Sequence, residues 1–97
     1  MKKIVLVCNA GMSTAMLAKR MNEAAEGEYY VEAHGEAEYI DFIEGCDLIL
    51  VGPQIRHIIP SIQSAVGDIP VKSINPQFYG LMNAKGVLDE VKKILPK

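Results

Sequence analysis

Apolar and polar residues follow one another along this chain with a spacing that switches repeatedly between two periods. Continuous apolar runs, or runs that alternate at every second residue, indicate strands, and apolar residues three or four apart indicate helices. Strands are therefore expected at residues 3–8, 29–34, 48–51 and 70–74. Helices are expected at residues 13–25, 37–44, 55–66 and 81–95, with a loop at 75–80.

Strands that alternate with helices through short connections predict an α/β fold, with a parallel sheet covered by helices on both faces. The runs at 3–8 and 48–51 are the most apolar, so we expect them at the centre of the sheet. The run at 29–34 alternates Val31 and Ala33 with polar residues, as an edge strand does. With right-handed crossovers the order is 2-1-3-4, that of the flavodoxin-like fold. Residues 1–97 contain no linker or repeat, which predicts a single domain.

The carboxyl ends of the central strands are the expected place for a functional site. In such sheets a ligand binds beyond these ends, at the point where the strand order reverses. That point lies between the strands at 3–8 and 48–51. Cys8 is expected there, together with the loops that begin at Gly52 and Asn75.

Cys8 is the residue with the clearest chemical potential. It ends an apolar run and precedes Asn9, Ala10, Gly11, Met12, Ser13 and Thr14, with Ser13 or Thr14 as the expected helix N-cap. A loop of about five residues can direct its N–H groups at one tetrahedral anion, and the helix N-terminus adds a partial positive charge. The pattern favours a thiolate that takes a phosphoryl group. The alternative is a buried cysteine followed by an ordinary capped turn.

Composition excludes several classes of function. The chain is 49% hydrophobic and 23% charged, with a formal net charge of −2. Its basic residues form no stripe of the kind that binds nucleic acids. No apolar run approaches the roughly 20 residues of a membrane span. The apolar stretch after Met1-Lys2-Lys3 is too short for an export signal. We therefore expect a cytoplasmic protein.

The second cysteine is not expected to pair with the first. Cys46 precedes the strand at 48–51, so parallel strands place its sulfur and that of Cys8 at opposite edges of the sheet, more than about 10 Å apart. A disulfide needs Cα atoms within about 7 Å. Cys46 is therefore expected to be a small buried hydrophobic residue. His34 and His57 lack a second ligand at metal spacing, so no metal or cofactor is expected, and both are assigned to the surface or to caps.

The segment from Cys8 to Thr14, after a Lys-Ile-Val-Leu-Val strand, resembles the lactose/cellobiose-type enzyme IIB component of the bacterial sugar phosphotransferase system. Residues 50–56, Leu-Val-Gly-Pro-Gln-Ile-Arg, and the chain length extend the resemblance. It implies a phosphoryl carrier. A phosphohistidine on the cytoplasmic IIA partner phosphorylates Cys8, and phosphocysteine then donates to a sugar held by the membrane partner IIC.

The resemblance also assigns the site. Cys8 is the nucleophile, and the backbone amides from Asn9 to Thr14 bind the phosphoryl oxygens. Gln54 and Tyr79 are further candidates, which would donate to the phosphate or order the residues around it. Met12 is expected in an apolar rim that contacts partners. The resemblance is compatible with cellobiose, chitobiose or lactose as the sugar, and a monomer is expected.

Two other enzyme classes are less consistent with the residues. Low-molecular-weight tyrosine phosphatases have an Arg and then a Ser or Thr where this chain has Thr14 and Ala15. Their late loop carries an acidic Asp where Asn75 stands, and an amide cannot act as a general acid. A thiol redox enzyme would need a resolving cysteine near Cys8, and Cys46 is expected at the other edge of the sheet.

The position of Cys8 gives a first prediction. Its thiol pKa should lie below the usual value of about 8.5, because a helix N-terminus and backbone amides stabilise the thiolate. Titration of the thiolate by its ultraviolet absorbance measures this midpoint. A midpoint at or above the usual value would contradict the assignment.

Overall fold

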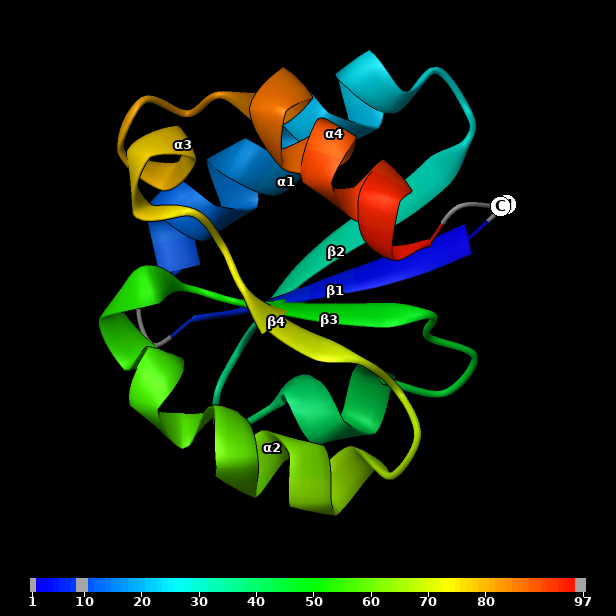
Figure 1. The fold of residues 1–97 in the computed structure, drawn as a ribbon, viewed down its shortest axis with the longest axis vertical. Coiled ribbons are helices and arrows are strands. Elements are labelled where there is room, and N and C mark those ends of the chain that lie inside the picture. Colours follow the sequence, from blue (N-terminus) through cyan, green and yellow to red (C-terminus); the bar gives the residue numbers. More distant parts are fainter. Residues whose placement is uncertain (1, 9–10, 96–97) are drawn as a thin grey trace.

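The computed structural model describes residues 2–8 and 11–95, and its elements follow the expected alternation of strands and helices. Figure 1 shows one sheet between two layers of helices. Here η denotes a short 3-10 helix. The elements in chain order are β1 (Lys2–Cys8), α1 (Gly11–Ala25), β2 (Tyr29–Gly35), η1 (Tyr39–Phe42), β3 (Leu48–Val51), η2 (Pro53–Ile58), α2 (Ile59–Val66), β4 (Val71–Ser73), α3 (Pro76–Gly80) and α4 (Ala84–Ile94).

The sheet has the predicted topology. Its four strands are all parallel and lie in the order β2-β1-β3-β4. Val7 pairs with His34 of β2 on one side and with Val51 of β3 on the other. The N–H of Gly52 donates to the carbonyl of Val7 at 2.8 Å. The end of β3 therefore runs directly beside the end of β1, where Cys8 lies.

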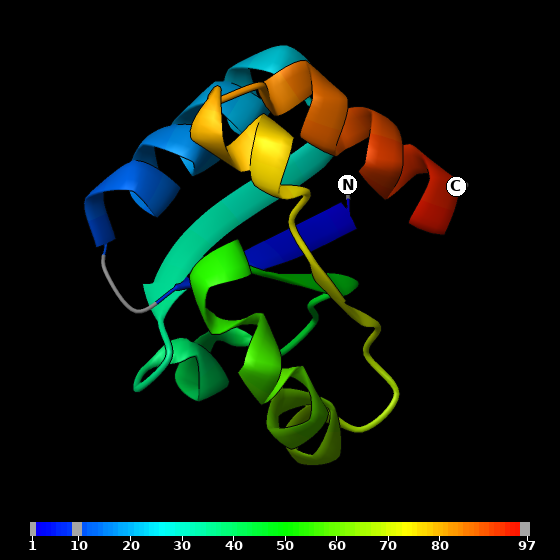
Figure 2. The ribbon, with the colours of Figure 1, turned by 60° about the vertical axis from the view of Figure 1, so that its left-hand side comes forward.

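Helices cover both faces of the sheet, as expected. In Figures 1 and 2, α1, α3 and α4 lie on one face and α2 lies on the other. Each face has its own core. The first core contains Leu17 and Met21 of α1 with Val91 of α4, and the second contains Ile62 of α2 and Ile55 of η2. Because β1 contributes to both cores, its residues from Ile4 to Val7 are 0% exposed.

The helix expected at residues 37–44 is wrong in type and length. The structure has a single short 3-10 helix, Tyr39–Phe42, and of its residues Tyr39 is the buried one. Ile40 and Phe42 are 45% and 41% exposed. A short segment with so little apolar contact lacks the tertiary packing that stabilises most α-helices.

Prolines set the other differences from the expected boundaries. The helix expected at 55–66 is a 3-10 helix followed by α2, which begins at Ile59 with Pro60 in its first turn, where no N–H is needed. The loop expected at 75–80 contains the short helix α3, which begins at Pro76. Asn75 caps this helix, because its Oδ1 accepts a hydrogen bond from the N–H of Gln77 at 2.9 Å.

The last helix starts later than expected. It begins at Ala84 rather than at Leu81, because Asn83 acts as its N-cap and accepts from the N–H of Gly86 at 3.0 Å. Leu81 lies outside the helix and is 76% exposed. The helix boundary is therefore set by a capping side chain and not by the apolar period.

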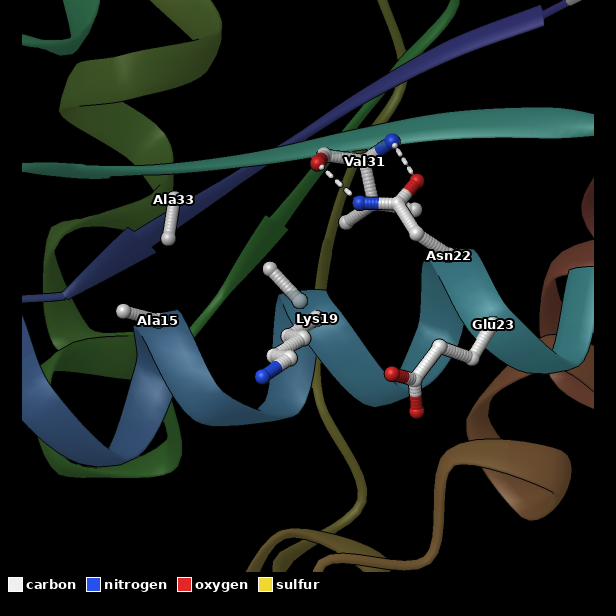
Figure 3. Close-up of a pocket in the computed structure, with 7 residues that line it drawn as sticks. Ala15, Lys19, Asn22, Glu23, Val31 and Ala33 are labelled. Atoms are coloured by element: carbon white, nitrogen blue, oxygen red, sulfur yellow. Dashed lines mark hydrogen bonds between the residues drawn. The ribbon is translucent and has the colours of Figure 1, made fainter.

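Asn22 of α1 protects the outer edge of the sheet. Its Nδ2 donates to the carbonyl of Val31 and its Oδ1 accepts from the N–H of the same residue, both at 2.8 Å. Figure 3 shows this pair of bonds in the groove between α1 and β2. An edge strand otherwise exposes such groups to water or to another chain. The amide of Asn22 therefore takes the place of a neighbouring strand at this position.

This pairing predicts that Asn22→Ala lowers the free energy of unfolding by about 2 kcal/mol, because two hydrogen bonds of roughly 1 kcal/mol each are lost. Urea denaturation measures the change. Glu23→Ala, at an exposed neighbouring position in the same groove, is the control and should change the stability by less than about 0.5 kcal/mol. Equal losses in the two variants would contradict this role of Asn22.

Candidate functional site

The sulfur of Cys8 lies inside the protein, at the carboxyl end of the central strand. Cys8 is 3% exposed, and its sulfur is 3.7 Å from the hydroxyl oxygen of Tyr79. That hydroxyl lies 3.1 Å from Oγ1 of Thr14. Thr14 and Tyr79 are 1% and 9% exposed. The fold therefore brings a thiol, a phenol and an alcohol from β1, α3 and α1 into one buried hydrogen-bonded group.

Gly52 forms another wall of this group. A Cβ at this position would lie 3.4 Å from the sulfur of Cys8 and 3.2 Å from Oε1 of Gln54. The backbone of Gly52 has φ −57° and ψ 144°, which other residues also adopt. A side chain here would thus press on the end of the Gln54 side chain and lie in van der Waals contact with the sulfur. The sequence had indicated only a break after the strand, although a glycine directly after a buried strand often marks a close approach.

The segment expected to bind phosphate differs from the expected loop. Asn9 and Ala10 lie outside the described residues, and α1 begins at Gly11. The expected cap at Ser13 or Thr14 is therefore wrong, since both belong to the first turn of α1. The first N–H groups of a helix have no partner within it. The amides of Gly11 to Thr14 accordingly belong to the first turn of α1, the part of a helix at which anions generally bind.

The side chains of Gly11, Met12 and Ser13 are not described, so the expectation that Met12 forms an apolar rim stays a prediction. Gln54 lies in η2 and is exposed, and its Oε1 and the sulfur of Cys8 both lie close to Gly52. Tyr79, the other candidate, contacts the sulfur directly, from α3 and not from a loop. Of these two candidates, the structure therefore brings Tyr79 into contact with Cys8.

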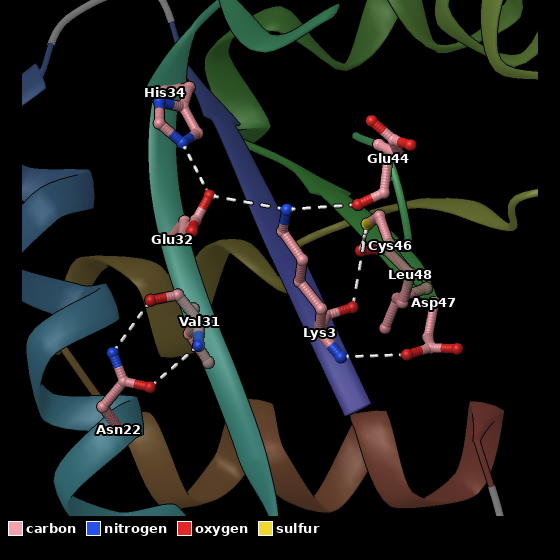
Figure 4. Close-up of polar contacts among 9 residues, drawn as sticks. All are labelled: Lys3, Asn22, Val31, Glu32, His34, Glu44, Cys46, Asp47 and Leu48. Atoms are coloured by element: carbon pink, nitrogen blue, oxygen red, sulfur yellow. Dashed lines mark hydrogen bonds and ion pairs between the residues drawn. The ribbon is translucent and has the colours of Figure 1, made fainter. Parts of the chain in front are cut away.

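Cys46 lies at the other end of the sheet, as expected. It is 8% exposed, and its sulfur donates to the carbonyl of Leu48 at 3.0 Å and contacts that of Lys3 at 3.7 Å. Figure 4 shows these contacts near the start of β1, whereas Cys8 is its last residue. Burial raises the pKa of the Cys46 thiol. This cysteine is part of the core, and neither cysteine forms a disulfide.

His34, which was assigned to the surface or to a cap, is partly exposed and has two side-chain contacts. Its ring stacks on that of Phe42, with centroids 3.8 Å apart and an interplanar angle of 6°. Its Nε2 is 3.0 Å from Oε1 of Glu32, and this hydrogen bond lowers the pKa of Glu32 (Figure 4). The ring therefore joins β2 to η1. The local pattern could not place Phe42 opposite His34.

Within residues 2–8 and 11–95, no three His, Cys, Asp or Glu side chains are grouped so that they could hold a metal ion. Over the same ranges, no helix is both long and apolar enough to cross a bilayer.

The two positions that distinguish this chain from the phosphatases have structural roles. Thr14 contacts the hydroxyl of Tyr79, and Asn75 caps α3, the helix that carries Tyr79. Neither side chain can supply the cation or the acid that a phosphatase uses at these positions. In the part of the site that the structure describes, the thiol therefore contacts the neutral hydroxyl of Tyr79, and the first turn of α1 contributes the hydroxyl of Thr14.

Comparison with known proteins identifies the family of this site. Residues 3–90 match the family described as "PTS system, Lactose/Cellobiose specific IIB subunit". The chain belongs to this family. It is a phosphoryl carrier of the lactose/cellobiose class, an enzyme component of the phosphotransferase system. Membership in this family implies IIA and IIC partners within that system.

Individual relatives agree with this membership. The oligo-beta-mannoside-specific EIIB component of Bacillus subtilis is 29% identical, over 98% of this chain and 97% of its own length. The cellobiose-specific EIIB component of Lactococcus lactis is also 29% identical, over 97% and 96%. The structure of a lactose-specific IIB component domain from Streptococcus pneumoniae has a TM-score of 0.82 at 20% identity, covering 95% of each chain. This last likeness shows that the fold is shared.

The close approach of Gly52 to the sulfur gives a prediction. Gly52→Ala should push the end of the Gln54 side chain aside and place a methyl group against the sulfur of Cys8, and it should therefore change the rate at which iodoacetamide alkylates Cys8 several-fold. Mass spectrometry in a Cys46→Ser background follows the alkylation. Gly80→Ala is the control, because nothing lies within 4 Å of a Cβ there. An unchanged rate in Gly52→Ala would show that the sulfur does not depend on this space.

Proposed function

We propose that Cys8 is the residue that carries the phosphoryl group. It receives the group from a phosphohistidine on the IIA partner and passes it to a sugar held by the IIC partner at the inner face of the membrane. The observation that carries this proposal is the position of the sulfur, at the carboxyl end of β1, next to the first turn of α1 and in contact with Tyr79.

The two transfer steps need only the Cys8 sulfur, the phosphohistidine of IIA and a hydroxyl of the sugar as reacting groups. In the first step the thiolate attacks phosphorus, the N–P bond of the phosphohistidine breaks, and the imidazole nitrogen keeps the electron pair. In the second step a sugar hydroxyl attacks phosphorus, its proton passes to a base on the acceptor side, and the sulfur leaves as a thiolate. Backbone amides from Asn9 to Thr14 bind the phosphoryl oxygens in both steps.

The surroundings of Cys8 suit a carrier better than a hydrolase. A carrier must hold its phosphoryl group until the correct acceptor arrives, so it should not activate water. Cys8 is almost fully buried, and Thr14 and Asn75 stand where a phosphatase has its Arg and its acid. Arginines that stabilise phosphoryl transfer contribute several powers of ten in rate. Their replacement supports slow hydrolysis and transfer to a specific partner.

The sugar belongs to the class of cellobiose, chitobiose and lactose, and its recognition is assigned to IIC. The equally similar relatives above are described for different sugars, which agrees with a carrier that does not itself select the sugar. We further expect residues 1–97 to act as one domain, as a monomer and in the cytoplasm.

Phosphorylation of purified variants tests the proposal. Wild-type protein, incubated with phosphoenolpyruvate, the general phosphotransferase proteins and a IIA partner, should gain one phosphoryl group on Cys8, located by intact mass and fragmentation. Cys8→Ser should gain none, because its hydroxyl does not ionise near neutral pH. Cys46→Ser is the matched control and should be phosphorylated like the wild type, since a serine can keep the hydrogen bond to Leu48.

The outcomes distinguish the two functions. Discharge of the phosphocysteine by a sugar only in the presence of IIC would support the carrier. Phosphoryl transfer to Cys8→Ser would contradict the assignment of Cys8. Steady release of phosphate from an aryl phosphate, with no phosphocysteine formed by any IIA, would indicate a phosphatase instead. Circular dichroism of each variant checks that it is folded.

A further inference from the structure

We propose that Tyr79 is a catalytic residue of the phosphoryl transfer, which donates its O–H to the Cys8 sulfur, and that Thr14 is the positioning residue that orients this hydroxyl. The proposal rests on the function proposed above, because the sulfur must be the reacting atom. It is carried by the hydrogen-bonded series of Cys8 sulfur, Tyr79 hydroxyl and Thr14 hydroxyl, with separations of 3.7 and 3.1 Å.

The hydroxyl of Tyr79 is held in place by its helix. Asn75 caps α3, and its carbonyl accepts from the N–H of Tyr79 at 2.9 Å. The ring of the adjacent Phe78 packs closely against Gly86 of α4. A Cβ added to Gly86 would lie 3.0 Å from the Phe78 ring. Tyr79 itself belongs to the core formed by α1 and α4. Its hydroxyl therefore reaches the sulfur from a ring that is fixed by packing.

The charge on the sulfur determines the direction of the hydrogen bonds. A thiolate has no proton and can only accept. Tyr79 must then donate to the sulfur, and its oxygen is free to accept from Thr14, whose hydroxyl can donate. Hydrogen bonds to an ionised group are stronger than neutral ones, and burial strengthens them further. The two hydroxyls therefore form an ordered donor series that stabilises negative charge on Cys8.

This donor has opposite effects on the two steps. When phosphocysteine transfers its group to the sugar, the S–P bond breaks, the sulfur keeps the electron pair, and negative charge develops beside the Tyr79 hydroxyl. A donor at that position stabilises the leaving thiolate. When Cys8 attacks the phosphohistidine, the same bond increases the thiolate fraction but reduces its nucleophilicity, since nucleophilicity falls as basicity falls. The donor should therefore promote discharge more than acceptance.

Tyr79→Phe tests the proposal, because it removes the hydroxyl and keeps the ring. In a Cys46→Ser background, we expect a roughly tenfold lower thiolate fraction for Cys8 near neutral pH, the size of one charge-assisted hydrogen bond. Discharge to sugar and IIC should slow by a similar factor. Acceptance from IIA should be slower near neutral pH but unchanged or faster at high pH, where the thiol is ionised in both proteins.

Two further variants complete the experiment. Thr14→Val keeps the shape of a side chain that is 1% exposed but removes the hydroxyl that orients Tyr79, so smaller changes in the same direction are expected. It also keeps the proposal testable if Tyr79→Phe does not fold. Tyr29→Phe is the matched control, because Tyr29 is 8% exposed in the same core but pairs with Lys2, at the far end of the sheet from Cys8.

The outcomes separate this inference from the proposed function. If wild-type protein acquires no phosphoryl group on Cys8, the proposed function fails. If wild-type protein is phosphorylated and Tyr79→Phe titrates and discharges like Tyr29→Phe, the role of Tyr79 alone is overturned. An equal loss in both steps at every pH would show that Tyr79 has a structural role only, and it would also overturn the inference.

Discussion

Strand β1 pairs with a parallel neighbour along both of its edges, and the positions of the other elements follow from that pairing. The strand is buried from Ile4 to Val7, so each face needs its own layer of helices, and the two cores form on either side of it. The carboxyl ends of neighbouring parallel strands lie at the same edge of the sheet. The carboxyl ends of β1 and β3 therefore lie side by side, which places Cys8 next to Gly52 and beneath the start of α1.

In the function proposed for Cys8, burial of its sulfur has two consequences that act against each other. Removal of water from Cys8 disfavours a thiolate, but it also protects a phosphorylated sulfur from hydrolysis. A helix N-terminus and a directed hydroxyl offset the first effect without adding a full positive charge. Neutral donors thus suit a site that must both accept and release a phosphoryl group, because a fixed cation would hold the group more strongly and favour its hydrolysis.

The residues that distinguish this chain from a phosphatase also position its own site. Thr14 stands where the phosphatase motif has an arginine, and it contacts the hydroxyl of Tyr79. Asn75 stands where the phosphatase loop has an acid, and it caps the helix that carries Tyr79. The same two positions of one sheet topology can therefore either catalyse hydrolysis, as in a phosphatase, or orient a tyrosine, as here. This agrees with the general rule that function depends on the site more than on the fold.

The sequence by itself determined the parallel sheet and its strand order, the place of Cys8 at the switch point and the separation of Cys46 from it, because burial and periodicity are local properties of each strand. Only the tertiary structure decided that Tyr79 contacts the sulfur, that Gly52 lies against it, that α1 begins at Gly11 and that His34 stacks on Phe42. These contacts join segments up to 71 residues apart. They depend on how helices such as α3 are capped and packed against the sheet, and a local pattern of apolar residues contains no information about such distances.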